Sequence, residues 1–158
     1  MPTNETIYEI DLNSRTINAP EFLSVATDHY AETVYFKVDR YFDNMDLTTT
    51  VCIIQYVNEN ATLDDGTTPA GGYIYPVPFY DVSYIDPTNK DKILIPWCIS
   101  GPATAAAGPI TFSVKFFLLN EEGTEYIYNL NTIPAESKIL HGMDVIREYT
   151  ENFYLTPT

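Results

Sequence analysis

Apolar side chains in this chain recur at every second residue, and that period constrains the fold more than any other feature. Val34, Phe36 and Val38 alternate with Tyr35, Lys37 and Asp39, as residues do in a strand with one face in water. No pattern with the helical period of about 3.6 residues continues beyond about two turns. The sequence therefore predicts an all-β protein.

The clearest strand is "ITFSVKFFLL", residues 110–119, in which every second residue from Ile110 to Leu118 is apolar. "NEEG", residues 120–123, then supplies turn-forming residues. The next stretch, "TEYIYNLNT", places Tyr126, Tyr128 and Leu130 on one face. Residues 110–132 are therefore predicted to form a β-hairpin.

Other strands are limited by their composition. Residues 51–57, "VCIIQYV", are apolar on both faces, which predicts a central strand packed on two sides. Proline cannot donate a ladder hydrogen bond, so the prolines in "YIYPVP" and "KILIPWCI" predict edge strands or a crossover. A change of alternation phase predicts a bulge near Phe79–Tyr80.

Dense turn chemistry separates these segments, at residues 58–72, 86–92 and 100–109. Seven to eight short strands without a substantial helix predict an antiparallel immunoglobulin-like β-sandwich, because such sheets must bury their apolar faces against each other. The sandwich is predicted to occupy residues 1–140. Residues 141–158 are predicted to form a C-terminal extension that docks on the sandwich or on a neighbour.

The net charge of the chain limits the classes of partner that it can bind. The chain has 158 residues, enough for one domain, and carries 8 basic against 22 acidic side chains, for a net charge of −14. Binding to nucleic acid or to an anionic membrane requires clustered Lys and Arg, so we expect neither partner. The first residues show no signal peptide, and the two cysteines, Cys52 and Cys98, are expected to be reduced and buried.

No catalytic or metal-binding constellation stands out. His29 follows Asp28 directly, and neighbours on an extended chain point to opposite sides, so a catalytic triad is not indicated. His141 could pair with an acid only by an accident of the fold. We therefore expect no enzyme activity, no catalytic residue and no cofactor.

Two acidic stretches offer the oxygen ligands that calcium prefers. The first contains Asp39, Asp43 and Asp46, and the second is Asp64–Asp65–Gly66. Both lack the ligand spacing of an EF-hand loop, and Asp43 with Asn44 favours a turn. We expect turns at both places and no bound metal.

Aromatic residues provide the strongest functional signal. Trp97, next to Cys98, is expected to lie in the core. Tyrosine rings can stack on sugars, fill a protein interface or line the margin of a core, and all three readings apply to the tyrosine-rich segment. The candidate interface residues are those of this segment and of the C-terminal tail: Tyr73, Tyr75, Tyr80, Tyr84, Phe153, Tyr154 and Leu155.

Three stretches carry a resemblance to a known group of proteins. They are "SRTINAPEFLSVATDHYAETVYFKVDRYFDNMDL", "YPVPFYDV" and "ITFSVKFFLLNEEGTEYIYNLNTIPAESKIL". Together they resemble proteins of tailed phages and prophages of Gram-positive gut bacteria, and more loosely the N-terminal domain of phage baseplate upper proteins. The resemblance covers roughly residues 7–145.

In that family a small immunoglobulin-like sandwich anchors host-attachment parts to the virion. The resemblance thus implies a non-enzymatic structural protein of a phage particle, assembled in the bacterial cytoplasm. It implies other virion proteins as partners, with homo-oligomers inside the particle, and leaves tail, baseplate and head decoration open. The alternative is a carbohydrate-binding module that recognises a host-surface glycan.

Overall fold

The chain folds almost entirely into β-strands, as the sequence predicts. Eight strands of five or more residues and four two-residue strands occur in the described part of the chain, together with short 3-10 turns. A computed structural model describes residues 7–25, 32–60, 72–77, 84–99 and 101–140.

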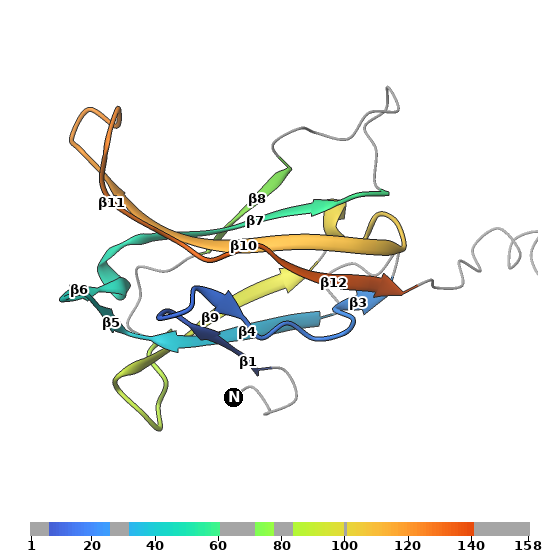
Figure 1. Cartoon of the computed structure of the whole chain (residues 1–158), viewed down its shortest axis with the longest axis horizontal. Helices are drawn as coiled ribbons and strands as arrows, with labels where there is room; N and C mark the ends of the chain where they lie inside the picture. The colour runs from blue at the N-terminus through green and yellow to red at the C-terminus, as the bar shows by residue number, and fades with distance from the viewer. Residues whose placement is uncertain (1–6, 26–31, 61–71, 78–83, 100, 141–158) are drawn as a thin grey trace, which may run out of the picture.

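The first sheet contains four strands in the order β2-β1-β4-β9, of which β1, β4 and β9 are labelled below β10 and β12 in the view of Figure 1. Its members are β1 (Ile7–Asp11), β2 (Thr16–Ile17), β4 (Glu32–Asp39) and β9 (Lys92–Ile99). β4 and β9 pair antiparallel over their full length, from Glu32 opposite Ile99 to Asp39 opposite Lys92.

The second sheet contains six strands in the order β3-β12-β10-β7-β8, and β11 also pairs with β10. Its longest strand, β10, lies between β7 on one side and both β12 and β11 on the other. The members are β3 (Ser24–Val25), β7 (Val51–Asn58), β8 (Tyr73–Val77), β10 (Gly108–Leu119), β11 (Tyr126–Asn131) and β12 (Ala135–Leu140).

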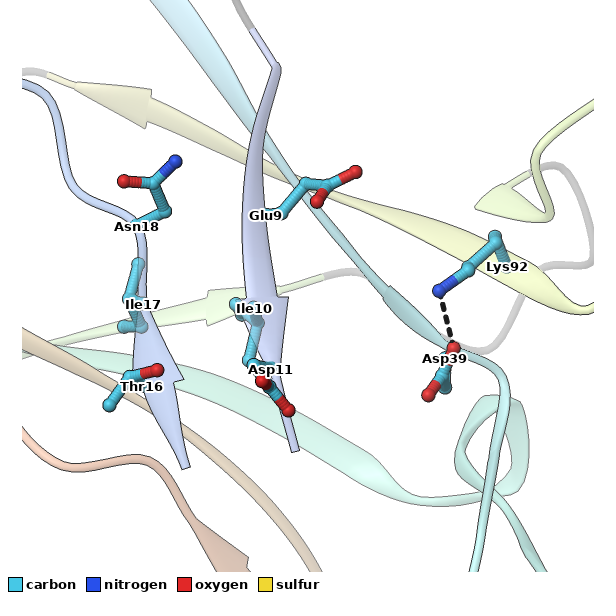
Figure 2. Close-up of a pocket in the computed structure, with 8 residues that line it drawn as sticks. All are labelled: Glu9, Ile10, Asp11, Thr16, Ile17, Asn18, Asp39 and Lys92. Carbon is cyan, nitrogen blue, oxygen red and sulfur yellow. Dashed lines mark hydrogen bonds and ion pairs between the residues drawn. The ribbon is translucent and has the colours of Figure 1, made fainter. Parts of the chain in front are cut away.

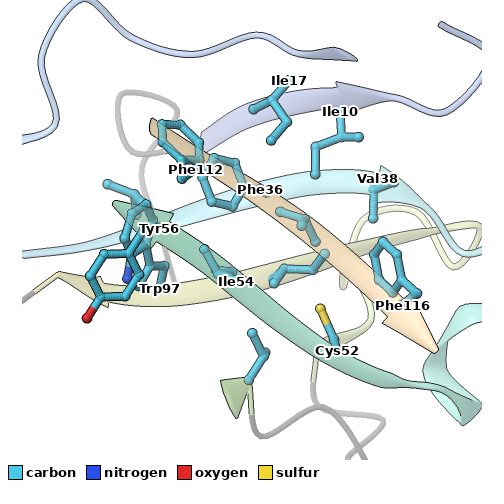
Figure 3. Close-up of a cluster of buried hydrophobic side chains, with 14 of the residues drawn as sticks. Ile10, Ile17, Phe36, Val38, Cys52, Ile54, Tyr56, Trp97, Phe112 and Phe116 are labelled. Atoms are coloured by element: carbon cyan, nitrogen blue, oxygen red, sulfur yellow. The ribbon is translucent and has the colours of Figure 1, made fainter. Parts of the chain in front are cut away.

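One hydrophobic core joins the inner faces of the two sheets (Figure 3). At its centre, Phe36 of β4 and Trp97 of β9 meet Phe112 of β10, with ring centroids 5.7 Å and 5.3 Å from that of Phe112. Trp97 is 1% exposed, which confirms its predicted place in the core. Burying such rings is the largest favourable term available to a chain of this kind.

The edge-strand prediction is confirmed for both proline-bearing strands. β8, which contains Pro76, ends the second sheet, and β9, which contains Pro96, ends the first. A residue without an N–H is tolerated there because one side of an edge strand has no ladder to complete. The bulge predicted near Phe79–Tyr80 lies outside the described residues.

The turn at Asp43–Asn44 is also confirmed. It joins two short strands, β5 (Tyr41–Phe42) and β6 (Met45–Asp46), and both turn residues have positive φ, 49° and 65°. Positive φ at both central positions defines the tight hairpin turn whose twist matches that of the flanking strands. Aspartate and asparagine tolerate this conformation better than most residues do.

The expectation of a wholly antiparallel sandwich is wrong. β1 runs parallel to β4, and β3 runs parallel to β12, so the sandwich is not wholly antiparallel. Between β2 and β3 the chain leaves the first sheet and joins the second, and it enters the edge beside β12 in the same direction. Single-strand alternation carries no information on such a change of sheet.

The prediction that residues 51–57 pack on both faces is also wrong. Cys52, Ile54 and Tyr56 point into the core and are buried, whereas Val51 and Ile53 remain half-exposed on the outer face. β7 does lie between two strands of its sheet, β10 and β8. Among the described residues, its apolar outer face is thus not covered by a third layer.

A buried polar side chain, that of Asn58, stabilises the end of one strand. Asn58, at the end of β7, donates to the carbonyl oxygens of Ala103 at 3.0 Å and Ala106 at 2.7 Å. Its own Oδ1 accepts a hydrogen bond from the Asn60 N–H. The amide thereby holds the segment before β10, which begins with the 3-10 turn η4 (Gly101–Thr104), against the end of β7.

Candidate interaction surface

The tyrosines of β8 point inward rather than into solvent. Tyr73 and Tyr75 pair with Tyr56 and Ile54, which face the core, and all these side chains pack in the same apolar cluster. The Tyr73 ring lies 5.8 Å from that of Tyr56. Tyr73 and Tyr75 therefore line the margin of the core. The side chains that β8 presents to solvent are those of Ile74 and Pro76.

The remaining candidates from the sequence divide into two groups. Tyr84 is half-buried and packs against the core. The other candidate side chains lie outside the described residues: Tyr80, Phe153, Tyr154 and Leu155.

Two acids of the first candidate calcium stretch each form an ion pair with a basic side chain. Asp39 pairs with Lys92, and Asp46 pairs with Arg40 at 3.1 Å. Burial alone would raise the pKa of Asp46, but hydrogen bonds from Arg40 and Thr48 outweigh it and lower that pKa. No three His, Cys, Asp or Glu side chains gather around a possible metal position in the described part of the chain. Asp64, Asp65 and both histidines lie outside that part.

The cysteines form no disulfide; both are free thiols. Cys52 is fully buried in the core, and this burial raises the pKa of its thiol well above the usual value. A thiol held neutral in apolar surroundings is a poor nucleophile. Cys98 lies on β9 and is half-buried.

A shallow cleft lies over the outer part of the first sheet (Figure 2). It has a volume of about 450 Å³ and carries the carboxylates of Glu9, Asp11 and Asp39. The ammonium of Lys92 reaches across to Asp39 (Figure 2). The residues that line this cleft include no histidine or cysteine, so its carboxylates and the Lys92 ammonium are its ionisable groups.

Four neighbouring strands of the second sheet differ in charge from the rest of the molecule. β7, β8, β10 and β11 contain no aspartate or glutamate, and Lys115 is their single basic residue. The whole chain, by contrast, has 22 acidic residues. A surface with few charged residues and many aromatic and aliphatic side chains is typical of the core of a protein interface.

Three strongly exposed apolar side chains lie on the β10–β11 hairpin. Tyr126 is 52% exposed and Ile127 is 67% exposed, while Leu119 is 42% exposed. The Lys115 ammonium lies 4.3 Å from the centroid of the Tyr126 ring and donates to its hydroxyl. Phe117 meets the same ring edge-on at 5.8 Å. We name Lys115, Phe117, Leu119, Tyr126 and Ile127 the hairpin patch.

A β-bulge explains why the sequence did not predict this patch. The pairing shifts between Leu118, which is opposite Tyr128, and Leu119, which is opposite Tyr126. The extra residue on β11 turns Tyr126 to the outer face, so it no longer shares a face with Tyr128 and Leu130. The prediction that these three side chains share a face is wrong for Tyr126.

The hairpin turn is built to hold the patch in place. Asn120 accepts hydrogen bonds at its Oδ1 from the N–H groups of Thr124 and Glu125. The Gly123 N–H donates to the Asn120 carbonyl at 3.0 Å, and Gly123 has a φ of 72°. A closed turn of this kind limits the freedom of Tyr126, so docking on the patch would cost less ordering entropy.

The patch continues as an apolar strip across the sheet. Phe117 and Lys115 are opposite Val51 and Ile53 of β7, and Ile53 is opposite Pro76 of β8. This surface offers aromatic and aliphatic side chains and one cation. A shallow hollow of about 190 Å³ lies beside it and is lined in part by Gln55 and Ser113. Such a surface suits binding rather than bond-making chemistry.

In the part of the chain that the structure describes, no helix has the length and apolarity needed to cross a membrane. Comparison of the chain with protein-family models, with curated proteins and with solved structures found no match.

Proposed function

We propose that this protein is a non-enzymatic structural component of a phage particle, an adaptor or decoration module that attaches to other virion proteins. The hairpin patch carries the proposal. It combines an exposed tyrosine and exposed aliphatic side chains with four strands free of carboxylates, in a chain that is otherwise strongly acidic. Clustered exposed apolar side chains are costly for a soluble monomer unless they serve a contact.

The strand order supports the immunoglobulin-like part of the proposal. The neighbours β12, β10, β7 and β8 follow the order of the G, F, C and C′ strands of an immunoglobulin variable-type sheet, with β4 and β9 in the places of B and E. The parallel pairing of β1 with β4 departs from that scheme. A modified immunoglobulin-like sandwich is compatible with the resemblance to phage baseplate domains.

Glycan binding is the second candidate function. It is favoured by the hollow lined in part by Gln55 and Ser113, whose side chains could donate to sugar hydroxyls, and by the exposed Tyr126 ring on the same face of the sheet. Aromatic rings stack on the apolar faces of sugars. Specific binding on a glycan array that is lost in Tyr126→Ser would favour this function over attachment to virion proteins.

The particle role is tested in cells that carry the phage or prophage encoding this chain. Particles are purified by density gradient after induction, and the chain is quantified against the major capsid protein by mass spectrometry. We expect a fixed number of copies per particle that persists after a high-salt wash, because the contact is largely apolar. The absence of the chain from washed particles would refute the particle role.

A further inference from the structure

The edges of the two sheets differ in how they are protected. Edge strands invite pairing with another chain, and proteins block them with very short strands, prolines or charges. β2 and β3 contain only two residues each, and β8 and β9 each contain a proline. In the described part of the chain, β11 is the exception among the strands with an open side: its six residues, "YIYNLN", include no proline and no charge.

β11 also has backbone groups that point away from β10. The Thr132 N–H donates to the Val114 carbonyl, so the backbone of Thr132 faces β10. Backbone groups of successive strand residues point to alternate sides, and those of Asn131 and Asn129 therefore point away from β10. Arg15 agrees with this, since its Nη1 reaches the Asn131 carbonyl from the open side at 3.2 Å.

Charge along this edge determines which partner fits it. At the start of β11 lie the exposed carboxylates of Glu121, Glu122 and Glu125. At its end lies a cation, Arg15, which bonds the Asn131 carbonyl, whereas the Lys115 ammonium lies over the ring of Tyr126. An antiparallel copy of the same strand would place the acidic end of each chain beside the basic end of the other.

We propose that β11 pairs antiparallel with β11 of a second copy of this chain, with the two-fold axis at Asn129. The two sheets then become continuous, and the two hairpin patches lie side by side on one larger face. A two-fold contact of this kind is isologous, since each copy presents the same strand to the other. The proposal identifies a partner of the hairpin and rests on the proposed function only for its place in a particle.

Few cations are available elsewhere to offset repulsion between copies with a net charge of −14. The contact is also short, so the dimer is weak and depends on concentration. In a particle, the surrounding copies would hold the two strands near each other at a high effective concentration. Salt weakens the end-to-end charge contacts, and we expect less dimer as ionic strength rises.

The test uses sedimentation equilibrium of the full chain. We expect an average mass that rises from one chain towards two as the concentration increases from about 1 µM to about 1 mM, within the range of weak interfaces. Ile127→Lys places a charge on the edge and should lower self-association at least tenfold. The matched control is Ile74→Lys, because Ile74 is 57% exposed on the proline-bearing edge strand β8 and gains the same charge.

Amide hydrogen exchange identifies the strand involved. The outward N–H of Asn129 should exchange slowly in the concentrated protein and rapidly after dilution. A wild-type chain that stays monomeric at about 1 mM would refute the pairing. So would equal effects of Ile127→Lys and Ile74→Lys, or a dimer that leaves the Asn129 amide unprotected. Because no particles enter these measurements, their outcome is separate from that of the particle assay.

Discussion

Replacing Trp97 by alanine is expected to destabilise the protein by about 3–5 kcal/mol, the range for removing a large ring from a packed core. The indole is 1% exposed and contacts the rings of Phe36, Tyr56 and Phe112. These rings come from both sheets, so the cavity would open where the two layers meet. We expect Trp97→Ala to be the most damaging single truncation proposed for this chain.

The measurement for Trp97→Ala is chemical denaturation followed by circular dichroism, because Trp97 is the single tryptophan of the chain and its fluorescence is lost in the variant. Phe22→Ala is the control, since Phe22 is 52% exposed and its truncation should change stability by no more than about 0.5 kcal/mol. Equal losses for the two variants would show that the sheets do not pack through Trp97.

The second large effect is expected from Asn58→Ala, at about 2–4 kcal/mol. The Asn58 side chain is buried, and its removal leaves the carbonyl oxygens of Ala103 and Ala106 without that donor. A buried polar group without a partner costs about 1–3 kcal/mol. Asn60→Ala is the matched control, because the Asn60 amide also holds a carbonyl of this segment, that of Ala107, but is exposed.

Thermal melts of both variants at one pH and salt concentration measure this difference. We expect the Asn58→Ala midpoint to fall clearly below that of Asn60→Ala, because water can replace the exposed amide but not the buried one. Equal midpoints would mean that the segment before β10 is held by other contacts.

The period-two pattern predicted most of the strands because one face of each is buried. Val34, Phe36 and Val38 of β4 are buried, and the alternate residues of β10 from Ile110 to Phe116 are as well. Proline positions predicted two edge strands for a local reason, the missing N–H. These features depend on a residue and its immediate neighbours, so they can be inferred from a single sequence.

The features that the sequence did not reveal depend on contacts between distant segments. The parallel neighbours of β4 and β12 follow from where the chain changes sheet between Ile17 and Ser24. The outward turn of Tyr126 follows from the bulge, which alternation alone does not show. Tyrosine has an apolar ring and a polar hydroxyl, so it suits both a core margin and an interface. Composition could therefore not decide that Tyr73 and Tyr75 point inward while Tyr126 points out.

We propose that this protein acts through the outer face of its second sheet and not through the acidic cleft of its first. Particle incorporation of two surface variants tests it most directly, with each substitution made in the phage or prophage genome. Tyr126→Glu alters the hairpin patch, and Glu9→Gln alters the cleft, both at exposed side chains. We expect Tyr126→Glu to lower the number of copies per particle about tenfold or more and Glu9→Gln to leave it unchanged. Normal incorporation of Tyr126→Glu, with loss in Glu9→Gln, would contradict the claim.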